Sequence, residues 1–399
     1  MKAPVVISMI IRDEEAVLRR CLDSISPHVD QISIVDTGST DDSFKIAKSY
    51  TEHVTKFHGA NADGRADGVL LSFADARNHA LEATERWTKF AGVEASFMMW
   101  LDASDVVVGG DQLAAAIEHS KLPEIARGGG ACHLCLDTQM LGLRGQVVQR
   151  FSRERVFARG KYRWRGRIHE VLHADGPSHE AFSPLVVIQR PFRQGPRRDP
   201  DRNLRILKKL VEGGEEPTAR NVFHLGREFA DRGEYAAARK WLLLYTQISQ
   251  FEDELACALL LLSELAAARL DLDEALQHAL HASIVKEQWR EPLIAAGKIL
   301  YLKASRGEEF RRNRERAMTI LVRSIEMRPP PPTKMITTLH LEIEAYRLLG
   351  CCHMDLGETN EARHCFEDAL KIDPGDEACK NLLERVSRKP SQSPSPGPR

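Results

Sequence analysis

The feature that most constrains the fold is an alternation of short apolar segments with longer amphipathic ones in the first half of the chain. The short segments predict strands, and the apolar residues at helical spacing predict helices between them. The predicted strands are Val5 to Ile11, Gln31 to Asp36, His53 to Phe57 and Ser96 to Asp102, with helices at 14–25, 41–50 and 73–87. This alternation predicts an α/β domain with a mostly parallel sheet and ligands at the carboxyl ends of its strands.

The second half changes to a helical pattern that repeats. Between Tyr346 and Pro374, small residues at Gly350, Ala362 and Ala369 recur at spacings that let two antiparallel helices touch. This pattern resembles the tetratricopeptide repeat. Further copies, less regular, occupy 223–245, 259–283 and the segment that ends at 317–329. Such units bury their apolar faces only against each other, so we expect a solenoid with a concave face.

The length of 399 residues predicts two domains of roughly 200 residues each. A stretch dense in proline, glycine and arginine, Ile188 to Arg202, is typical of a linker. We therefore expect a first domain at 1–192, a linker at 193–202 and helical repeats at 203–386. The last residues, 387–399, lack apolar side chains for a core and are expected to be disordered.

The overall charge excludes a general attraction to anionic partners. The net charge is −1, from 56 basic and 57 acidic residues, so no nucleic-acid partner is expected and anion binding must be local. The longest apolar run, Leu255 to Leu262, is far shorter than the ~20 residues that span a bilayer. With no signal peptide evident at the start, we expect a cytoplasmic protein without a transmembrane segment.

The cysteines give no strong metal signal. Among eight cysteines, Cys132 and Cys135 form one CxxC, without the second pair or the spaced histidines of a zinc site. We interpret them as small residues on a buried strand. A redox pair is the alternative, and nothing in the surrounding sequence supports it.

The first acidic motif is Asp36-Thr37-Gly38, which follows an apolar strand. An aspartic protease would need a second such motif or a symmetric dimer, and no second Asp-Thr-Gly or Asp-Ser-Gly occurs. Ser39 and Thr40 are suited to cap a helix that begins here. The Gly-rich fingerprint GxGxxG is also missing, so a nicotinamide cofactor is not expected. The Asp36 carboxylate remains a candidate to accept hydrogen bonds from a uracil N–H or a ribose hydroxyl.

The second acidic motif contains Asp102 and Asp105, at the end of another apolar strand. Carboxylate oxygens of this kind suit Mg²⁺ or Mn²⁺ bridging a diphosphate, and such a metal would neutralise charge on a leaving nucleotide. The alternative is structural, with Asp102 or Ser104 capping the next turn.

The order of these motifs, with "DARNHAL" between them and "WRGRIHE" after them, resembles the family 2 glycosyltransferases of GT-A fold. The likeness covers most of Val5 to Leu172 and is strongest to the branch fused to tetratricopeptide repeats. It implies a nucleotide-diphosphate sugar donor, with Asp36 contacting the base and Arg77 and Asn78 shaping the nucleotide site.

The same resemblance implies a metal site. Asp102 matches the first acid of the family's Asp-x-Asp motif, but Ser104 stands where the second acid is expected. The neighbouring Asp105 is a candidate substitute, and His169 is expected to complete the site. We therefore expect Mn²⁺ or Mg²⁺ as cofactor, although Ser104 places metal use and activity in question.

A basic stretch supplies candidates for phosphate binding. Eight basic residues lie between Arg150 and Arg167, against one acid, Glu154. About half of them are expected simply to face solvent. Because a guanidinium fork fits phosphate oxygens in a bidentate manner, we select Arg150, Arg153 and Arg163 as candidates.

Inversion at a sugar carbon needs a carboxylate that accepts the acceptor's proton. Glu170, in the segment that resembles the family's Gly-x-Ile-His-Glu, is the first candidate, and Asp137 is the reserve. We expect an inverting transferase whose repeats recruit a protein or peptide acceptor, because helical grooves commonly hold extended peptides. Saccharide or lipid-linked acceptors remain open. The alternative is a scaffold or protein-binding module whose transferase domain has lost turnover.

Overall fold

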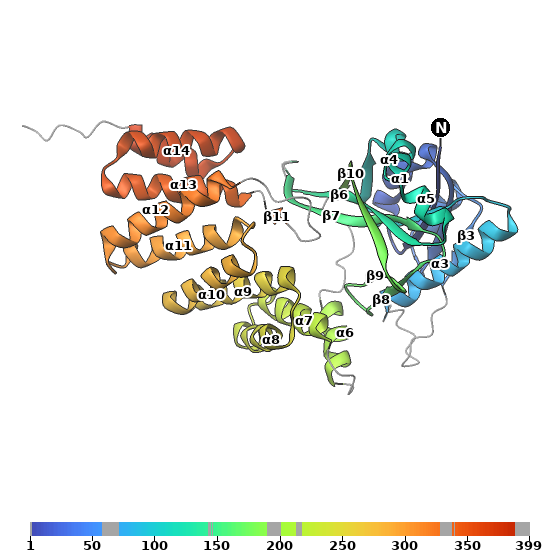
Figure 1. Ribbon diagram of the computed structural model, residues 1–399, viewed down its shortest axis with the longest axis horizontal. Coiled ribbons are helices and arrows are strands. Elements are labelled where there is room, and N and C mark those ends of the chain that lie inside the picture. The colour runs from blue at the N-terminus through green and yellow to red at the C-terminus, as the bar shows by residue number, and fades with distance from the viewer. Residues whose placement is uncertain are drawn as a thin grey trace, which may run out of the picture. The chain divides into compact units, whose positions relative to one another are not determined.

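The computed structural model describes residues 2–57, 72–142, 145, 147–189, 201–212, 218–327, 337–338 and 340–387. The predicted disordered tail lies outside these ranges apart from residue 387, as does the predicted linker apart from residues 201 and 202. The chain divides into two compact units, 1–213 with 332–337, and 214–331 with 338–399 (Figure 1). Helix α6 (Arg202–Glu212) groups with the first unit, whereas the sequence assigns it to the repeats. The Arg202 guanidinium lies 4.8 Å from the centre of the Phe73 ring in that unit.

The first unit is built on one large mixed sheet. Its strands run in the order β3-β2-β1-β4-β7-β6-β10-β5. Strands β1, β2, β3 and β4 pair in parallel, as predicted, but β7 is antiparallel to both β4 and β6. The strands are β1 (Ala3–Ile11), β2 (Val29–Asp36), β3 (Val54–Lys56), β4 (Phe97–Met99), β5 (Asp105–Val108), β6 (Ala131–Leu141), β7 (Val147–Ala158) and β10 (Ser178–Gln189). A separate hairpin pairs β8 (Tyr162–Arg165) with β9 (Val171–Ala174), and a short strand, β11, is Thr337–Thr338.

Helices cover both faces of this sheet. Alternate residues of a strand point to opposite faces, so Phe97 and Met99 enter the larger core while Met98 enters a second core with Trp100. Helices α1, α4 and α5 pack on the larger core and α3 on the other face. The helices of this unit are α1 (Glu15–Ile25), α2 (Ser43–Lys48), α3 (Phe73–Phe90), α4 (Leu113–His119) and α5 (Leu122–Arg127), with 3-10 turns at Ser26–His28 and Gly110–Gln112.

The start of α3 follows from its sequence. Ser72 precedes the helix in extended conformation, and its hydroxyl oxygen accepts a hydrogen bond from the Asp75 backbone N–H at 3.1 Å. The aspartate also favours the positive end of the helix dipole. This cap fixes where the helix begins, and thereby the positions of Arg77 and Asn78 on its first turns.

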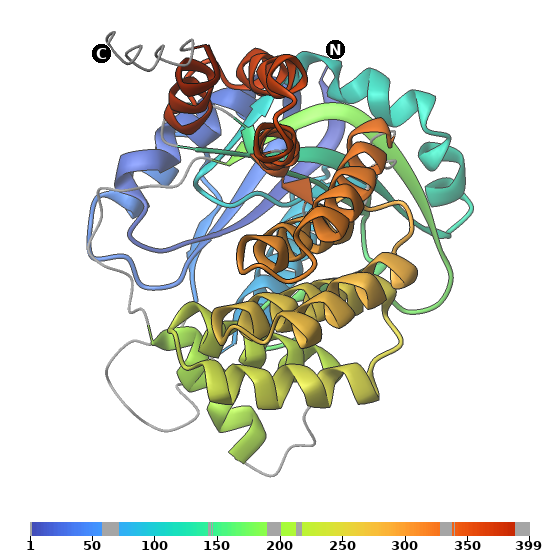
Figure 2. The same cartoon turned by 90° about the vertical axis from the view of Figure 1, so that its left-hand side faces the viewer.

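The second unit is a stack of antiparallel helix pairs, which runs from yellow-green to red in Figure 2. Small residues set the close approach within pairs, as predicted: a Cβ on Gly226 would lie 2.8 Å from Leu242, and one on Gly350 would lie 2.5 Å from Phe366. The pairs are α7 (Ala219–Asp231) with α8 (Tyr235–Ile248), α9 (Glu252–Ala268) with α10 (Leu272–Val285), α11 (Glu291–Ser305) with α12 (Phe310–Glu326), and α13 (His340–Leu356) with α14 (Thr359–Ile372), followed by α15 (Glu377–Ser387).

Among the described residues, no helix combines the length and the apolar character that crossing a membrane requires.

Candidate functional site

The candidate site lies where parallel strands β1, β2 and β4 end, at one edge of the sheet. Asp36 is the last residue of β2, and Asp102 follows β4 after Trp100 and Leu101. Because strands β2 and β4 both pair in parallel with β1, their carboxyl ends lie on the same side. The fold thus places the two predicted acidic motifs at the edge where open α/β sheets bind ligands.

The loops after β1 and β2 are joined by hydrogen bonds between side chains and backbone. Oδ1 of Asp13 accepts from the Thr40 backbone N–H at 2.7 Å, and Oε2 of Glu15 accepts from that of Asp42 at 3.0 Å. In return, the N–H of Glu15 donates to Oδ2 of Asp41 at 3.1 Å. Sequence reasoning missed Asp13 and Glu15, since acids at a helix start read as ordinary first-turn residues. They fix the loop that carries the Asp36 motif.

Asp36 is buried, with 2% of its surface exposed. Its Oδ1 accepts hydrogen bonds from the Ser39 backbone N–H at 3.1 Å and from the Ser39 hydroxyl at 2.5 Å. The prediction that Ser39 or Thr40 caps the next helix is wrong, because α2 begins at Ser43 and Ser39 is used by Asp36 instead. Gly38, at φ 105°, provides the left-handed turn that brings Ser39 back. The role of Asp36 in base recognition stays a prediction.

Arg77 links two segments that are far apart in the sequence. Its Nη2 donates to Oδ1 of Asp102 at 2.8 Å, and its Nε donates to Oε1 of Glu170 at 2.7 Å. Burial alone would lower the pKa of Arg77, but the two carboxylates outweigh it and raise the pKa above its usual value. The guanidinium is therefore a fixed cation, and three of the predicted site residues meet at it.

The Arg77 guanidinium lies beside the rings of two tryptophans. Its central carbon lies 4.8 Å from the ring centre of Trp100 and 4.9 Å from that of Trp164, and the two indoles contact edge to face. Asn78 follows Arg77 on α3; its Nδ2 donates to the Trp164 carbonyl oxygen at 2.9 Å, and its Oδ1 accepts from the Trp164 backbone N–H at 2.8 Å. In the described chain Asn78 thus anchors β8, which carries Trp164, to α3.

Trp100 also contacts two arginines from β7. Arg155 lies 3.9 Å and Arg153 5.0 Å from the Trp100 ring centre. Arg155 is fully buried, and none of its guanidinium nitrogens makes a well-formed hydrogen bond within the described residues. Arg153 is half-buried, and no carboxylate in the described part of the chain forms an ion pair with it. Trp100 and Arg155 were not predicted, because one read as core and the other as part of a solvated basic face.

Asp102 and Asp105 differ sharply in environment, although they are three residues apart. The Asp102 side chain is 43% exposed. Burial would raise the pKa of Asp102, but Arg77 and Arg155 prevail and hold that pKa below its usual range. Asp105 is fully buried, and burial together with the nearby Asp102 charge raises its pKa against the opposing effect of Arg155.

The Asp105 carboxylate is already occupied. Its Oδ2 lies 2.9 Å from Nη1 of Arg155 and accepts from the Asp102 backbone N–H at 2.9 Å, while Oδ1 accepts from the Gln189 side chain at 2.9 Å. These contacts weigh against the predicted role of Asp105 as a metal ligand. If Asp105 turned to bind a cation, the buried Arg155 would lose the carboxylate that compensates its charge.

The predicted metal ligands do not come together in the described residues. The possible ligand atoms of Asp102, Asp105 and His169 do not all lie within 4.8 Å of one another. Among the described residues, His133, Cys135 and Glu180 meet that criterion. His169 is half-buried and adopts a left-handed backbone at φ 51°, which is uncommon for a histidine. The side chains at Asp102 therefore do not fit a three-residue site for Mn²⁺ or Mg²⁺, and the metal cofactor stays a prediction.

The remaining candidates make contacts of their own. Nε of Arg150 donates to Oδ1 of Asp137 at 2.8 Å, and Asp137 also accepts from Gln139 at 2.8 Å. Nη1 of Arg163 lies 3.7 Å from Glu85 of α3. Three arginines were predicted to bind phosphate. Among them, Arg153 is the one that lies beside Trp100, as Arg77 does.

The models of two known families match one segment in each half of the chain. Residues 6–87 match the model of glycosyl transferase family 2, and residues 343–376 match that of the tetratricopeptide repeat. Both resemblances inferred from the motifs are thereby confirmed. A comparison with curated proteins found no match.

Several solved tetratricopeptide structures are similar to part of the chain. The crystal structure of MamA is 18% identical, with a TM-score of 0.35, and covers 44% of this chain and 90% of its own. YrrB, titled a tetratricopeptide protein with an unusual peptide-binding site, is 13% identical, with a TM-score of 0.36 and coverages of 47% and 84%. TTC0263, a thermophilic tetratricopeptide protein of Thermus thermophilus, is 16% identical, with a TM-score of 0.32 and coverages of 47% and 90%.

Proposed function

We propose that the first unit is an inverting glycosyltransferase that moves a sugar from a nucleotide-diphosphate donor to an acceptor recruited by the helical repeats. The observation that carries this proposal is the convergence of Asp102 and Glu170 on the Arg77 guanidinium, at 2.8 and 2.7 Å. The family match at 6–87 includes Arg77 but ends before the two acids. The contacts therefore add to the match rather than repeat it.

The donor diphosphate is assigned to the space beside Trp100. Arg153 offers a guanidinium without an ion-paired carboxylate among the described residues, and a guanidinium fork suits two phosphate oxygens. Burial and the neighbouring Arg155 lower the pKa of Arg153, and a bound anion would oppose both effects. Asp36, at the end of the neighbouring part of the sheet, is assigned to the base.

Glu170 is assigned as the general base. Its side chain is 12% exposed, and the contact of its Oε1 with Nε of Arg77 at 2.7 Å keeps the carboxyl group at a fixed position. In the transfer step the acceptor's nucleophilic atom forms a bond to the sugar's anomeric carbon, and its proton passes to Glu170. The bond between that carbon and the diphosphate oxygen breaks on the opposite face, and the nucleotide diphosphate leaves with the electron pair, stabilised by Arg153.

We derive no step through a metal, because the described side chains around Asp102 do not assemble the predicted ligand set. A need for Mn²⁺ or Mg²⁺ is kept as a measurable proposal: donor turnover is to be compared with added Mn²⁺, with added Mg²⁺ and with EDTA.

The repeats are assigned to a polypeptide acceptor. Stacked helix pairs form a concave surface that suits an extended peptide. A saccharide acceptor is the alternative, and it would be recognised by the first unit alone.

The test uses purified full-length chain with a panel of UDP- and GDP-sugars, following slow donor hydrolysis and nucleotide binding. We expect Glu170→Gln to lower turnover by about 10²- to 10⁴-fold while nucleotide still binds. Asp137→Asn is the matched control, since Asp137 is held by Arg150 and Gln139. Undiminished transfer by Glu170→Gln, with loss in Asp137→Asn, would overturn the assignment.

A second candidate function, a scaffold without turnover, is favoured by one observation: Ser104 replaces an expected acid and the adjacent Asp105 is committed to Arg155. The same panel separates the two. Absence of both turnover and nucleotide binding across all donors would favour the scaffold.

A further inference from the structure

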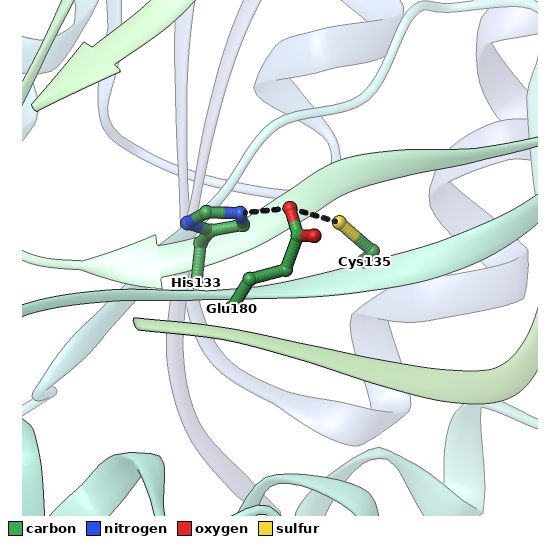
Figure 3. Close-up of side chains that lie close together, drawn as sticks. All are labelled: His133, Cys135 and Glu180. Carbon is green, nitrogen blue, oxygen red and sulfur yellow. Dashed lines mark hydrogen bonds and ion pairs between the residues drawn. The ribbon is translucent and has the colours of Figure 1, made fainter. Parts of the chain in front are cut away.

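A cluster of histidine, cysteine and glutamate lies on the sheet, built from residues given no role above. His133 and Cys135 stand two apart on β6, so both point to the same face. Strand β10 runs parallel to β6 with Glu180 directly opposite His133. Figure 3 shows the three side chains turned toward one another, with the Glu180 carboxylate between the imidazole and the thiol.

The distances are close to those of a metal site. Nε2 of His133 lies 2.8 Å from Oε2 of Glu180, the same oxygen lies 3.6 Å from Sγ of Cys135, and all three ligand atoms lie within 4.8 Å of one another. Tetrahedral zinc with its usual bond lengths separates nitrogen and oxygen ligands by about 3.3 Å and sulfur and oxygen ligands by about 3.5 Å. The sulfur-to-oxygen distance already fits, and the histidine-to-glutamate distance needs to open by about half an ångström.

The imidazole of His133 is oriented by Tyr162. Its Nδ1 lies 3.0 Å from the Tyr162 hydroxyl, and the two rings pack edge to face. When Nδ1–H donates to that oxygen, Nε2 keeps its lone pair and directs it toward Glu180 and Cys135. A hydrogen bond from the far ring nitrogen is the usual support of a metal-binding histidine.

The CxxC motif does not act as a pair, because residues three apart on a strand point to opposite faces. Sγ of Cys132 lies 3.5 Å from the Leu122 carbonyl oxygen in the larger core, and burial raises the pKa of Cys132 to about 11. Cys135 faces His133 instead. Cys132 therefore supplies a control on the same strand.

We propose that His133, Cys135 and Glu180 bind one Zn²⁺ ion, with water as the fourth ligand. Nitrogen, thiolate and carboxylate together suit zinc, whereas Mg²⁺ and Ca²⁺ prefer oxygen ligands alone. His133 and Cys135 are buried, and the Glu180 side chain, 32% exposed, provides the path by which the ion enters. The ion joins β6 to β10 and is separate from any metal that the sugar-transfer reaction uses.

The proposal is tested with Co²⁺, a spectroscopic substitute for Zn²⁺, added to the chelator-treated full chain. We expect one equivalent to give the intense thiolate-to-cobalt absorption and the visible bands of a tetrahedral site, and Zn²⁺ to displace it. Cys135→Ser is expected to remove the thiolate band, and Cys132→Ser to keep it. Unfolding curves of the metal-free variants check that each is folded.

Two milder variants guard against misfolding. Glu180→Gln retains a side chain that can accept from or donate to Nε2 of His133 but is a poor ligand, and Tyr162→Phe removes only the support of the imidazole. Each is expected to weaken Zn²⁺ binding by at least about tenfold. Absence of the cobalt–thiolate band in the wild-type chain, or its persistence in Cys135→Ser, would overturn the proposal and leave these residues as a hydrogen-bonded trio.

Discussion

Nη2 of Arg77 donates a hydrogen bond to Oδ1 of Asp102 at 2.8 Å, although the two residues belong to a helix and to the loop after a strand on which that helix packs. Oε1 of Glu170 accepts a hydrogen bond from Nε of the same guanidinium at 2.7 Å. One arginine therefore sets the position of both acids. Its planar fork makes two directed bonds at once, which a lysine could not reproduce.

The first prediction concerns the pH dependence of stability from Asp102. Arg77 and Arg155 outweigh burial and lower the pKa of Asp102 in the folded chain. Below about pH 4 the unfolded chain binds a proton at Asp102 before the folded chain does, so folding loses stability as pH falls through the folded pKa. In urea titrations at several pH values, the stability difference between wild type and Asp102→Asn should shrink over that acidic range. A constant difference would contradict this origin of the lowered pKa.

The second prediction concerns the ion pair of Asp105 and Arg155. Both side chains are fully buried, and Oδ2 of Asp105 lies 2.9 Å from Nη1 of Arg155. Removing one partner leaves a buried charge without compensation, so Asp105→Asn and Arg155→Met should each lower the free energy of unfolding by about 3–5 kcal/mol. The double variant should lose less than the sum of the two, as denaturant curves of all four proteins would measure. Full additivity would mean that the pair has no coupling.

The strand and helix positions of the first unit were largely predictable. Four apolar segments indicated β1 to β4, and the amphipathic segments indicated α1 and α3, because one buried face leaves a clear period. Strand β4 ends at Met99 rather than Asp102, although the Trp100 backbone N–H still donates to the Arg155 carbonyl of β7. The antiparallel partners of β7 were not predictable, since the register of long strands depends on contacts that spacing alone does not encode.

The site was predictable only where a motif named it. Arg77, Asp102 and Glu170 came from the resemblance, and the described contacts join them. Trp100 and Arg155 carry no sequence signal of their own, because an apolar residue and a strand arginine each have a commoner explanation. Glu180 could not have been linked to His133, since the two meet through the pairing of β6 with β10, 47 residues apart.

The third prediction concerns the contact between the helices of the last repeat. A Cβ on Gly350 would lie 2.5 Å from Cε1 of the fully buried Phe366. Gly350→Val should therefore force α13 and α14 apart and destabilise the helical unfolding transition, seen by circular dichroism, by at least about 1–3 kcal/mol. Glu367→Val, at an exposed position of α14, is the control and should change stability by less than about 0.5 kcal/mol.

The fourth prediction concerns Arg153 and the donor. Arg153→Ala removes a guanidinium that has no ion-paired carboxylate in the described chain, so stability should change little. Loss of a charged hydrogen bond should weaken nucleotide-diphosphate binding by about tenfold or more in titration calorimetry. Arg150→Ala is the control, because it makes the same change at an arginine that is paired with Asp137. Its nucleotide affinity should stay within about twofold of the wild-type value. Equal losses in the two variants would refute a specific role for Arg153.

The fifth prediction separates recognition from chemistry at Asp36. The carboxylate is held by the N–H and hydroxyl of Ser39, and an amide at this position keeps one oxygen for those bonds but lacks the charge that would hold a base N–H or a ribose hydroxyl. Asp36→Asn should weaken nucleotide binding by about tenfold, with donor turnover at saturation much less affected. Ser39→Ala tests the loop, because it removes the hydroxyl and leaves the carboxylate. Turnover that is lost while nucleotide affinity stays unchanged would make Asp36 a catalytic residue and contradict its assignment to the base.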